Sequence, residues 1–266
     1  MPLSNLEYLP LRLLRRFVFS DAFLLRWGRL LPYYRTNHNQ ADPAPLAEAY
    51  LRHWPAVSTA ETVLEIGVGA TNSTGYELAA RNPRARIVLL EPFVAFDPAL
   101  DRKLLAEVAA RHRCAPETLT ARVRRVTSLA TEPNAAHSVI LSTSVLEHVA
   151  APAALFAALR RVLRPDGVML HLVDYRDHFF KYPLHFLQFR KAVWSRWLDP
   201  GDLPRWRLYD HIEALEAAGF AVSLPEIRHD PAAFARIAPQ LSPDFRKDDP
   251  RVGVTFAALL AQPVPR

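Results

Sequence analysis

Apolar and polar positions alternate in two different rhythms through the middle of the chain. Short apolar runs have the length of buried strands, and longer segments between them place apolar residues at helical spacing. The predicted strands cover residues 63–66, 86–90, 122–126, 138–141 and 168–173. The predicted helices cover residues 73–81, 101–112 and 152–163. Strands that alternate with helices predict a parallel sheet with helices on both faces.

The turn after the first predicted strand holds two glycines close together. It lies in the stretch VLEIGVGATNST, residues 63–74, and contributes Gly67 and Gly69 to a chain that has only eight glycines. Such a turn can bend sharply and lets a ligand lie against backbone amides. The helix that follows favours negative charge at its N-terminus. Because ligands of open α/β sheets bind beyond the carboxyl ends of the strands, we expect a ligand at this turn.

The acid at the end of the second predicted strand narrows the class of ligand. Glu91 stands where a carboxylate accepts hydrogen bonds from ribose hydroxyls, so the turn and the acid together indicate a nucleoside. A dinucleotide fingerprint requires a third glycine three residues after the second, and Asn72 occupies that place. The sequence therefore argues against NAD.

At this point the chain resembles the class I S-adenosylmethionine-dependent methyltransferases, and within them the type 11-like bacterial members. Glu65, Gly67 and Gly69 match the acid and the two glycines of the family's first motif, while Thr71 replaces a frequent third glycine. Glu91 matches the acid after the second strand. The later segments SVLEHV, LRRVLRPDGVMLHLVD and LYDHIEALEAAGF, which begin at Ser144, Leu159 and Leu208, follow in the family's order. The resemblance implies a Rossmann-like, doubly wound α/β fold with a seven-stranded sheet, and an enzyme that uses S-adenosylmethionine.

The resemblance also implies where the cofactor binds. The candidate cofactor residues are Glu65, Gly67, Gly69, Ala70, Thr71, Glu91, Ser128, Leu129, Ser142 and Ser144. Many relatives hold the adenine amino group with an aspartate after the third strand, whereas this chain has Thr127, Ser128 and Leu129 there. The adenine contacts would then rest on backbone groups or on Ser128.

A hydroxyl acceptor needs a base that takes its proton, and candidates for this base should lie at the carboxyl end of the fourth or fifth strand. Our candidate base is His178, with Asp174 or Asp177 as the acid that orients its ring. His148 is an alternative base. The other interpretation is that the aspartates cap turns and that His178 is a surface residue. His171 should point into the sheet and be structural, and we predict no metal ligands.

Two extensions should define the acceptor. Residues 175–207, after the fifth strand, interleave basic residues with aromatic ones, among them Trp194, Trp197 and Trp206. Aromatic faces beside cations suit a sugar ring or an anionic glycan. Alternatively, these aromatic side chains pack a helical insert.

The N-terminal extension, residues 1–40, precedes a methyltransferase domain at residues 41–266, and residues 36–45 form the expected linker. Residues 1–31 resemble an interfacial amphipathic helix and predict peripheral membrane contact; the alternative is docking on the domain as a lid or dimer contact.

Composition limits the compartment and the partners. The single cysteine, Cys114, argues against a disulfide framework, and no apolar run approaches the length of a membrane span, so we expect a cytoplasmic protein. The net charge of +6 is scattered and no nucleic-acid recognition motif accompanies it, so we do not expect a nucleic-acid partner. We expect methylation of a hydroxyl on a small molecule or glycan. The alternatives are a lipid or isoprenoid acceptor at a membrane surface, and a catalytically silent partner subunit.

Overall fold

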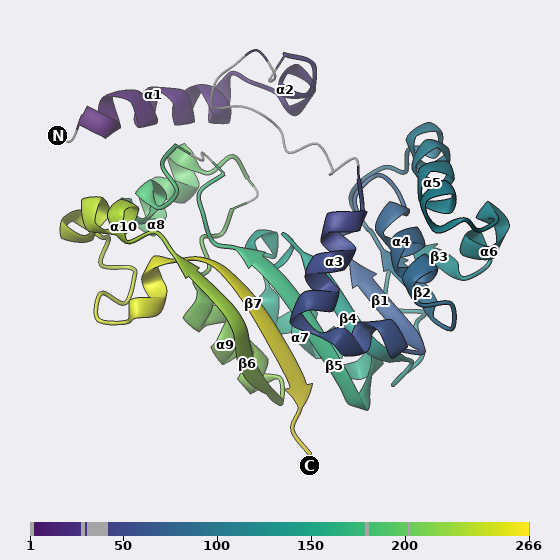
Figure 1. Ribbon diagram of the computed structural model, residues 1–266. Helices are drawn as coiled ribbons and strands as arrows, with labels where there is room; N and C mark the ends of the chain where they lie inside the picture. Colours follow the sequence, from purple (N-terminus) through teal and green to yellow (C-terminus); the bar gives the residue numbers. More distant parts are fainter. Residues whose placement is uncertain (1–2, 28–29, 31–41, 179–180, 202, 266) are drawn as a thin grey trace.

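The computed structural model describes residues 3–27, 30, 42–178, 181–201 and 203–265 of the chain. Its centre is a seven-stranded sheet in the order β3-β2-β1-β4-β5-β7-β6 (Figure 1). The strands are β1 Thr62–Ile66, β2 Arg86–Leu90, β3 Val123–Val126, β4 His137–Thr143, β5 Leu163–Asp174, β6 Phe220–His229 and β7 Val254–Pro263. The doubly wound, seven-stranded fold predicted from the sequence is confirmed.

One strand departs from the predicted parallel arrangement. β7 lies between β5 and β6 and is antiparallel to both. The connection from β6 to β7 consists of short helices: α10 Pro231–Ile237, η6 Ala238–Gln240 and η7 Pro250–Gly253. It leaves β6 and enters β7 at the same end of the strands, so β7 has to run antiparallel to β6.

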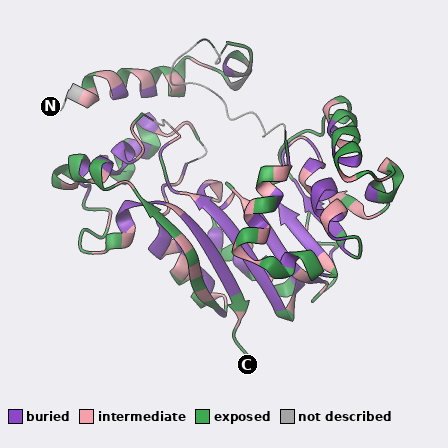
Figure 2. Ribbon diagram, viewed as in Figure 1, coloured by how far each residue is buried: buried purple, intermediate pink, exposed green. Residues whose placement is uncertain are grey.

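Helices cover both faces of the sheet, and the strands between them are buried (Figure 2). One face packs against α3 Ala44–His53, η2 Pro55–Thr59, α4 Ser73–Arg81, α5 Pro98–His112 and α6 Pro116–Thr120. The other face packs against α7 Pro152–Val162 and α9 Leu208–Ala217. The strand order reverses between β1 and β4, which puts the switch point of the fold between the two strands nearest the glycine turn.

The segment after β5 forms a small layer with its own apolar core. Its short helices are η4 His185–Gln188, α8 Lys191–Val193 and η5 Trp194–Leu198. Trp194 is 2% exposed and packs with Phe186, so the packing interpretation holds for these two aromatic side chains. Arg205 and Arg207 are also buried and donate to backbone carbonyls, whereas Trp197 is exposed.

The N-terminal extension forms α1 Leu3–Phe17 and α2 Asp21–Trp27, and α1 packs over the segment after β5 (Figure 1). Tyr8 is buried, and its ring stacks on Phe189 with 5.8 Å between ring centroids. Lys181 forms an ion pair with Glu7. These contacts agree with docking on the domain. The boundary at residue 40 and most of the expected linker lie outside the described residues.

No helix in the described part of the chain combines the length and the apolarity needed to cross a bilayer.

Candidate active site

The glycine turn after β1 packs against the segment that follows β4. Gly67 has a φ of +74°, and its backbone N–H donates to the carbonyl of Leu90 at 2.9 Å. A Cβ atom at this position would lie 2.3 Å from Cγ2 of Val145. Gly69 has a φ of +67°. Side chains are therefore excluded from Gly67 by its backbone conformation and by a neighbour within the protein.

Glu91 joins the loops that follow β1 and β2. One carboxylate oxygen accepts the backbone N–H of Gly69 at 2.8 Å, and the other accepts those of Phe93 and Val94 at 3.0 and 3.1 Å. Each oxygen of a carboxylate can accept more than one hydrogen bond. Glu91 can therefore hold the loops and still accept from a ligand.

Arg125 and Asp101 support the same turn, and the sequence did not predict either role. The guanidinium of Arg125, on β3, donates to the carbonyl of Gly69 at 2.5 Å and to that of Thr71 at 3.4 Å. Asp101, on α5, accepts the backbone N–H of Asn72 at 2.6 Å, just before the N-terminus of α4. No periodicity marks these residues, because their partners are far away in the sequence.

Glu65 lies beneath the turn, at the carboxyl end of β1. Its side chain is buried, and Oε1 accepts the hydroxyl of Tyr50 at 3.1 Å, which accepts in turn from Thr143. Burial raises the pKa of Glu65 to about 8. Oε2 is buried and has no hydrogen-bond partner among the described residues.

The other candidate cofactor residues follow the ends of β1, β3 and β4. Thr71 is buried, with its hydroxyl 3.0 Å from that of Ser73, and the carbonyl of Ala70 accepts the N–H of Asp97. Ser128 and Leu129 form the turn after β3, where the Ser128 hydroxyl accepts the N–H of Ala130.

The two serines near the end of β4 differ in exposure. Ser144 is exposed and has a φ of +51°, an uncommon conformation for serine. The hydroxyl of Ser142, in contrast, is buried 2.7 Å from Nδ1 of His171, so its side chain is used within the core. His171 has the structural position that the sequence predicted.

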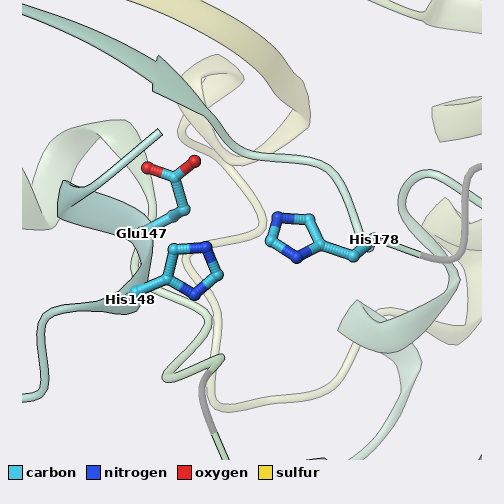
Figure 3. Close-up of side chains that lie close together, drawn as sticks. All are labelled: Glu147, His148 and His178. Carbon is cyan, nitrogen blue, oxygen red and sulfur yellow. The ribbon is translucent and has the colours of Figure 1, made fainter. Parts of the chain in front are cut away.

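Glu147, His148 and His178 come together beside this edge of the sheet (Figure 3). The first two lie in η3 Leu146–His148, after β4, and His178 lies in the loop after β5. The two imidazole rings are 4.8 Å apart between centroids. Burial raises the pKa of Glu147 to about 8, and the negative charge of Asp174 adds to this effect. The sequence had suggested both histidines, but not Glu147.

The two candidate orienting aspartates have different partners. Asp174 accepts from the guanidinium of Arg176 at 2.7 Å. Asp177 is fully buried, forms an ion pair with Arg12 and accepts the hydroxyl of Tyr8. Asp177 therefore anchors α1, a role that the sequence did not predict. Glu147 is the acid that the structure groups with both histidines.

The segment after β5 covers Glu147. The indole N–H of Trp206 donates to the carbonyl of Val149 at 2.8 Å, next to η3. A narrow space beside Glu147 is lined by Asp174, Phe186, Leu203 and Trp206. The predicted insert thus reaches the end of β4, where it limits access of water to Glu147.

Comparisons with known proteins identify the fold. The structure aligns with a 1,6-didemethyltoxoflavin N1-methyltransferase of Burkholderia thailandensis, solved with S-adenosylhomocysteine, at 18% identity over 92% of this chain and 89% of that one, with a TM-score of 0.50. It aligns with an N-methyltransferase of Haemonchus contortus, solved with phosphomonomethylethanolamine and S-adenosylhomocysteine, at 14% identity over 96% and 60%, with a TM-score of 0.54. An O-methyltransferase family protein of Burkholderia thailandensis aligns at 13% identity and a TM-score of 0.49, over 91% of this chain and 59% of that one.

The chain thus spans less than two thirds of the length of two of these three structures. A search of curated proteins finds no match. A family model described as a methyltransferase domain matches residues 37–223, well over half of the chain. The chain therefore belongs to the class I methyltransferase family, whose cofactor is S-adenosylmethionine.

Proposed function

We propose that this protein transfers a methyl group from S-adenosylmethionine to a hydroxyl group of a small molecule or glycan. The proposal rests on the position of two groups of residues at the same edge of the sheet. The nucleoside-type turn of Gly67, Gly69 and Glu91 lies at the ends of β1 and β2, and the group of Glu147, His148 and His178 lies at the ends of the neighbouring strands β4 and β5.

The residues beneath the turn fit the cofactor. The orphan Oε2 of Glu65 can accept from the ammonium of the methionine part, and Glu91 can accept from the ribose hydroxyls. Ser128 and Leu129 would border the adenine. The backbone of Gly67, Gly69, Ala70 and Thr71, together with the segment from Ser142 to Ser144, would complete the pocket. When bound, the cofactor supplies a methyl group that its positively charged sulfur has already activated.

The histidines determine which kind of acceptor fits best. A hydroxyl has to lose its proton during methylation, whereas an amine in its free-base form does not. His178, with His148 beside it, offers imidazole nitrogens that can take this proton. Asp174 remains a candidate to orient them, while Asp177 is held in its ion pair with Arg12. The cover formed by Phe186, Leu203 and Trp206 would exclude water.

A screen for turnover tests the proposal. Purified full-length protein is incubated with S-adenosylmethionine and sets of hydroxylated small molecules and glycans, and the release of S-adenosylhomocysteine is measured. On the acceptor so found, His178→Ala should lower kcat by about 10² to 10⁴, as removal of a general base does, with cofactor affinity unchanged.

His229→Ala is the matched control, because His229 is exposed at the end of β6. Equal kcat values for His178→Ala and the wild type would remove His178 from the mechanism. Cofactor binding without turnover on any acceptor would favour the catalytically silent partner subunit.

A second candidate acceptor is a lipid or isoprenoid at a membrane surface. Large apolar side chains remain exposed along α1 and α2 and at Leu30, including Leu6 at 63% and Phe17 at 58%. Trp197, beside Phe17, is also exposed, and Arg15 and Arg16 lie in the last turn of α1. Exposed apolar residues beside cations are typical of surfaces that bind anionic membranes.

A further inference from the structure

We propose that Glu147, His148 and His178 bind a divalent transition-metal ion, for which Zn²⁺ is the probe. Each residue offers one ligand atom, and these atoms all lie within 4.8 Å of one another. Two imidazoles and one carboxylate form a ligand set of catalytic zinc sites, which keep a further position open for water or substrate. Mg²⁺ and Ca²⁺ prefer sites made of oxygen atoms, so the two histidines favour a transition metal.

The geometry needs only a small adjustment. The three side chains converge from η3 and from the loop after β5 (Figure 3). In a tetrahedral site with metal–nitrogen distances of about 2.0–2.1 Å, neighbouring ligand atoms are about 3.4 Å apart. The observed atoms would have to approach by at most about 1.4 Å. His178 lies in a loop and His148 ends a short helix, so rotation of their side chains can close this difference.

The burial of Glu147 independently favours a cation at this site. Glu147 is 2% exposed, and neither of its carboxylate oxygens has a hydrogen-bond partner of ordinary distance and angle among the residues that the structure describes, although the Ser144 hydroxyl and the backbone amide of Asp174 lie near it. A buried carboxyl group without a partner is costly unless it is neutralised or bound to a cation. A metal ion would supply the charge that the surrounding residues do not.

The position of the site suggests what the metal would do, and this step rests on the proposed function. Both histidines are partly exposed, and they lie at the edge of the sheet where an acceptor should bind. A hydroxyl oxygen bound in the open position would have a lower pKa and would release its proton to water. His178 would then act as a ligand that positions the acceptor, and the metal would replace it as the group that promotes deprotonation.

Metal binding can be measured without turnover. Full-length protein, freed of metal with a chelator and then dialysed, is titrated with ZnCl₂ in a calorimeter and with CoCl₂ in a visible spectrophotometer. We expect one tight site for each metal and the visible absorption bands of a low-coordinate Co²⁺ site. Glu147→Gln, His148→Ala and His178→Ala should each weaken Zn²⁺ binding by at least about tenfold, since even changes to the partners of metal ligands have effects of that size. His229→Ala, with one exposed histidine removed, should bind as the wild type does.

Several outcomes would overturn the metal site. They are an unchanged Zn²⁺ affinity in His178→Ala, an equal loss in His229→Ala, and the absence of Co²⁺ bands in the wild type. Circular dichroism confirms that each variant is folded, and His178→Asn repeats the test with a side chain of similar shape at this loop position.

A parallel titration with S-adenosylmethionine separates this inference from the proposed function. Cofactor binding and undiminished turnover in the chelator-treated protein, without a Zn²⁺ site, would refute the metal and leave the methyltransferase. A Zn²⁺ site in a protein that does not bind S-adenosylmethionine would support the metal site and refute the proposed function.

Discussion

At the scale of the residue, two separate constraints require glycine at position 67: its backbone conformation and its contact with a neighbouring side chain. A positive φ favours glycine for backbone reasons, and the contact with Val145 excludes even a methyl group. The contact joins the glycine turn to the segment that carries Glu147 and His148. A change at Gly67 should therefore disturb both halves of the candidate site.

Gly67→Ala should destabilise the protein more than the same change at Gly219. Gly219 also has a positive φ, +84°, but a Cβ atom there would have no neighbour within 4 Å in the described part of the chain. We expect about 1–2 kcal/mol for the backbone effect at either position, and about 1–3 kcal/mol more at Gly67 for the clash. Urea denaturation gives both values, and the additional substitution Val145→Ala should recover part of the loss at Gly67. Equal free-energy costs at the two glycines would contradict the role of Val145.

The buried acid Glu65 predicts how stability depends on pH. Its pKa is raised to about 8 in the folded protein, above the ordinary value near 4.5. Between pH 4.5 and pH 8, the folded protein therefore keeps the Glu65 proton, whereas the unfolded protein has released it. The contribution of Glu65 to stability is fully present below about pH 4.5 and is lost as the pH rises through about 8. Between these pH values, the free energy of unfolding should fall by on the order of 1 kcal/mol per pH unit because of Glu65.

Glu65→Gln keeps the shape of the side chain and removes its titration. In cofactor-free protein, thermal unfolding should show a smaller decline in stability from pH 5 to pH 8 for this variant than for the wild type. The same decline in both proteins would mean that Glu65 is ionised throughout this range.

At the scale of the element, α1 is fastened to the segment after β5 by a buried ion pair. Arg12 binds Asp177, and its guanidinium also lies 5.1 Å from the ring centroid of Trp194. Both members of the pair are buried, whereas most ion pairs of the described residues include an exposed side chain. Removing one partner of a buried pair leaves the other charge in an apolar environment.

Arg12→Ala should therefore release α1. We expect a loss of about 3–5 kcal/mol for a buried pair, against about 0–1 kcal/mol for Arg164→Ala, which removes an exposed pair with Asp166. Hydrogen exchange should become faster in residues 3–17 of Arg12→Ala and remain unchanged in Arg164→Ala. Unchanged protection of α1 in both variants would show that apolar packing alone holds the helix.

The elements also show which features could be predicted from the sequence. β2 and α4 have the predicted bounds, because an apolar run and helical spacing are local patterns. The reversed direction of β7 could not be predicted, since pairing depends on how a connection returns in space. Glu147 lies in a segment that matches the family, but its place beside His178 could not be predicted, because His178 follows β5 and Glu147 follows β4. Asp177 was predicted to orient the base because it follows β5. Its true partners on α1 lie too far away in the sequence to be predicted.

At the scale of the whole molecule, apolar exposure is concentrated at one extension of a basic protein. The net charge is +6, and several of the most exposed large apolar residues belong to residues 6–30. Tyr8 and Leu24 turn inward, so the extension has a buried face and an exposed apolar face. This arrangement suits contact with a membrane surface while α1 stays docked.

Co-sedimentation with vesicles tests this contact. The protein should bind vesicles that contain anionic phospholipid, and Phe17→Glu should weaken binding because it places a negative charge among the exposed apolar residues of α1. Val264→Glu is the control, since Val264 is exposed near the other end of the chain. Binding should weaken as salt is added. If both variants bind as the wild type does, α1 is not the membrane contact.

The anchor between α1 and Asp177 also imposes an order of events on the folding of the chain. Tyr8 leaves the ribosome 169 residues before its acceptor Asp177. Throughout that interval the helix has no site on which to dock, and the side chains that it finally buries stay in contact with solvent or with other molecules of the cell. α1 is therefore synthesised well before it can dock, because its binding site forms only once β5 and the loop after it have folded.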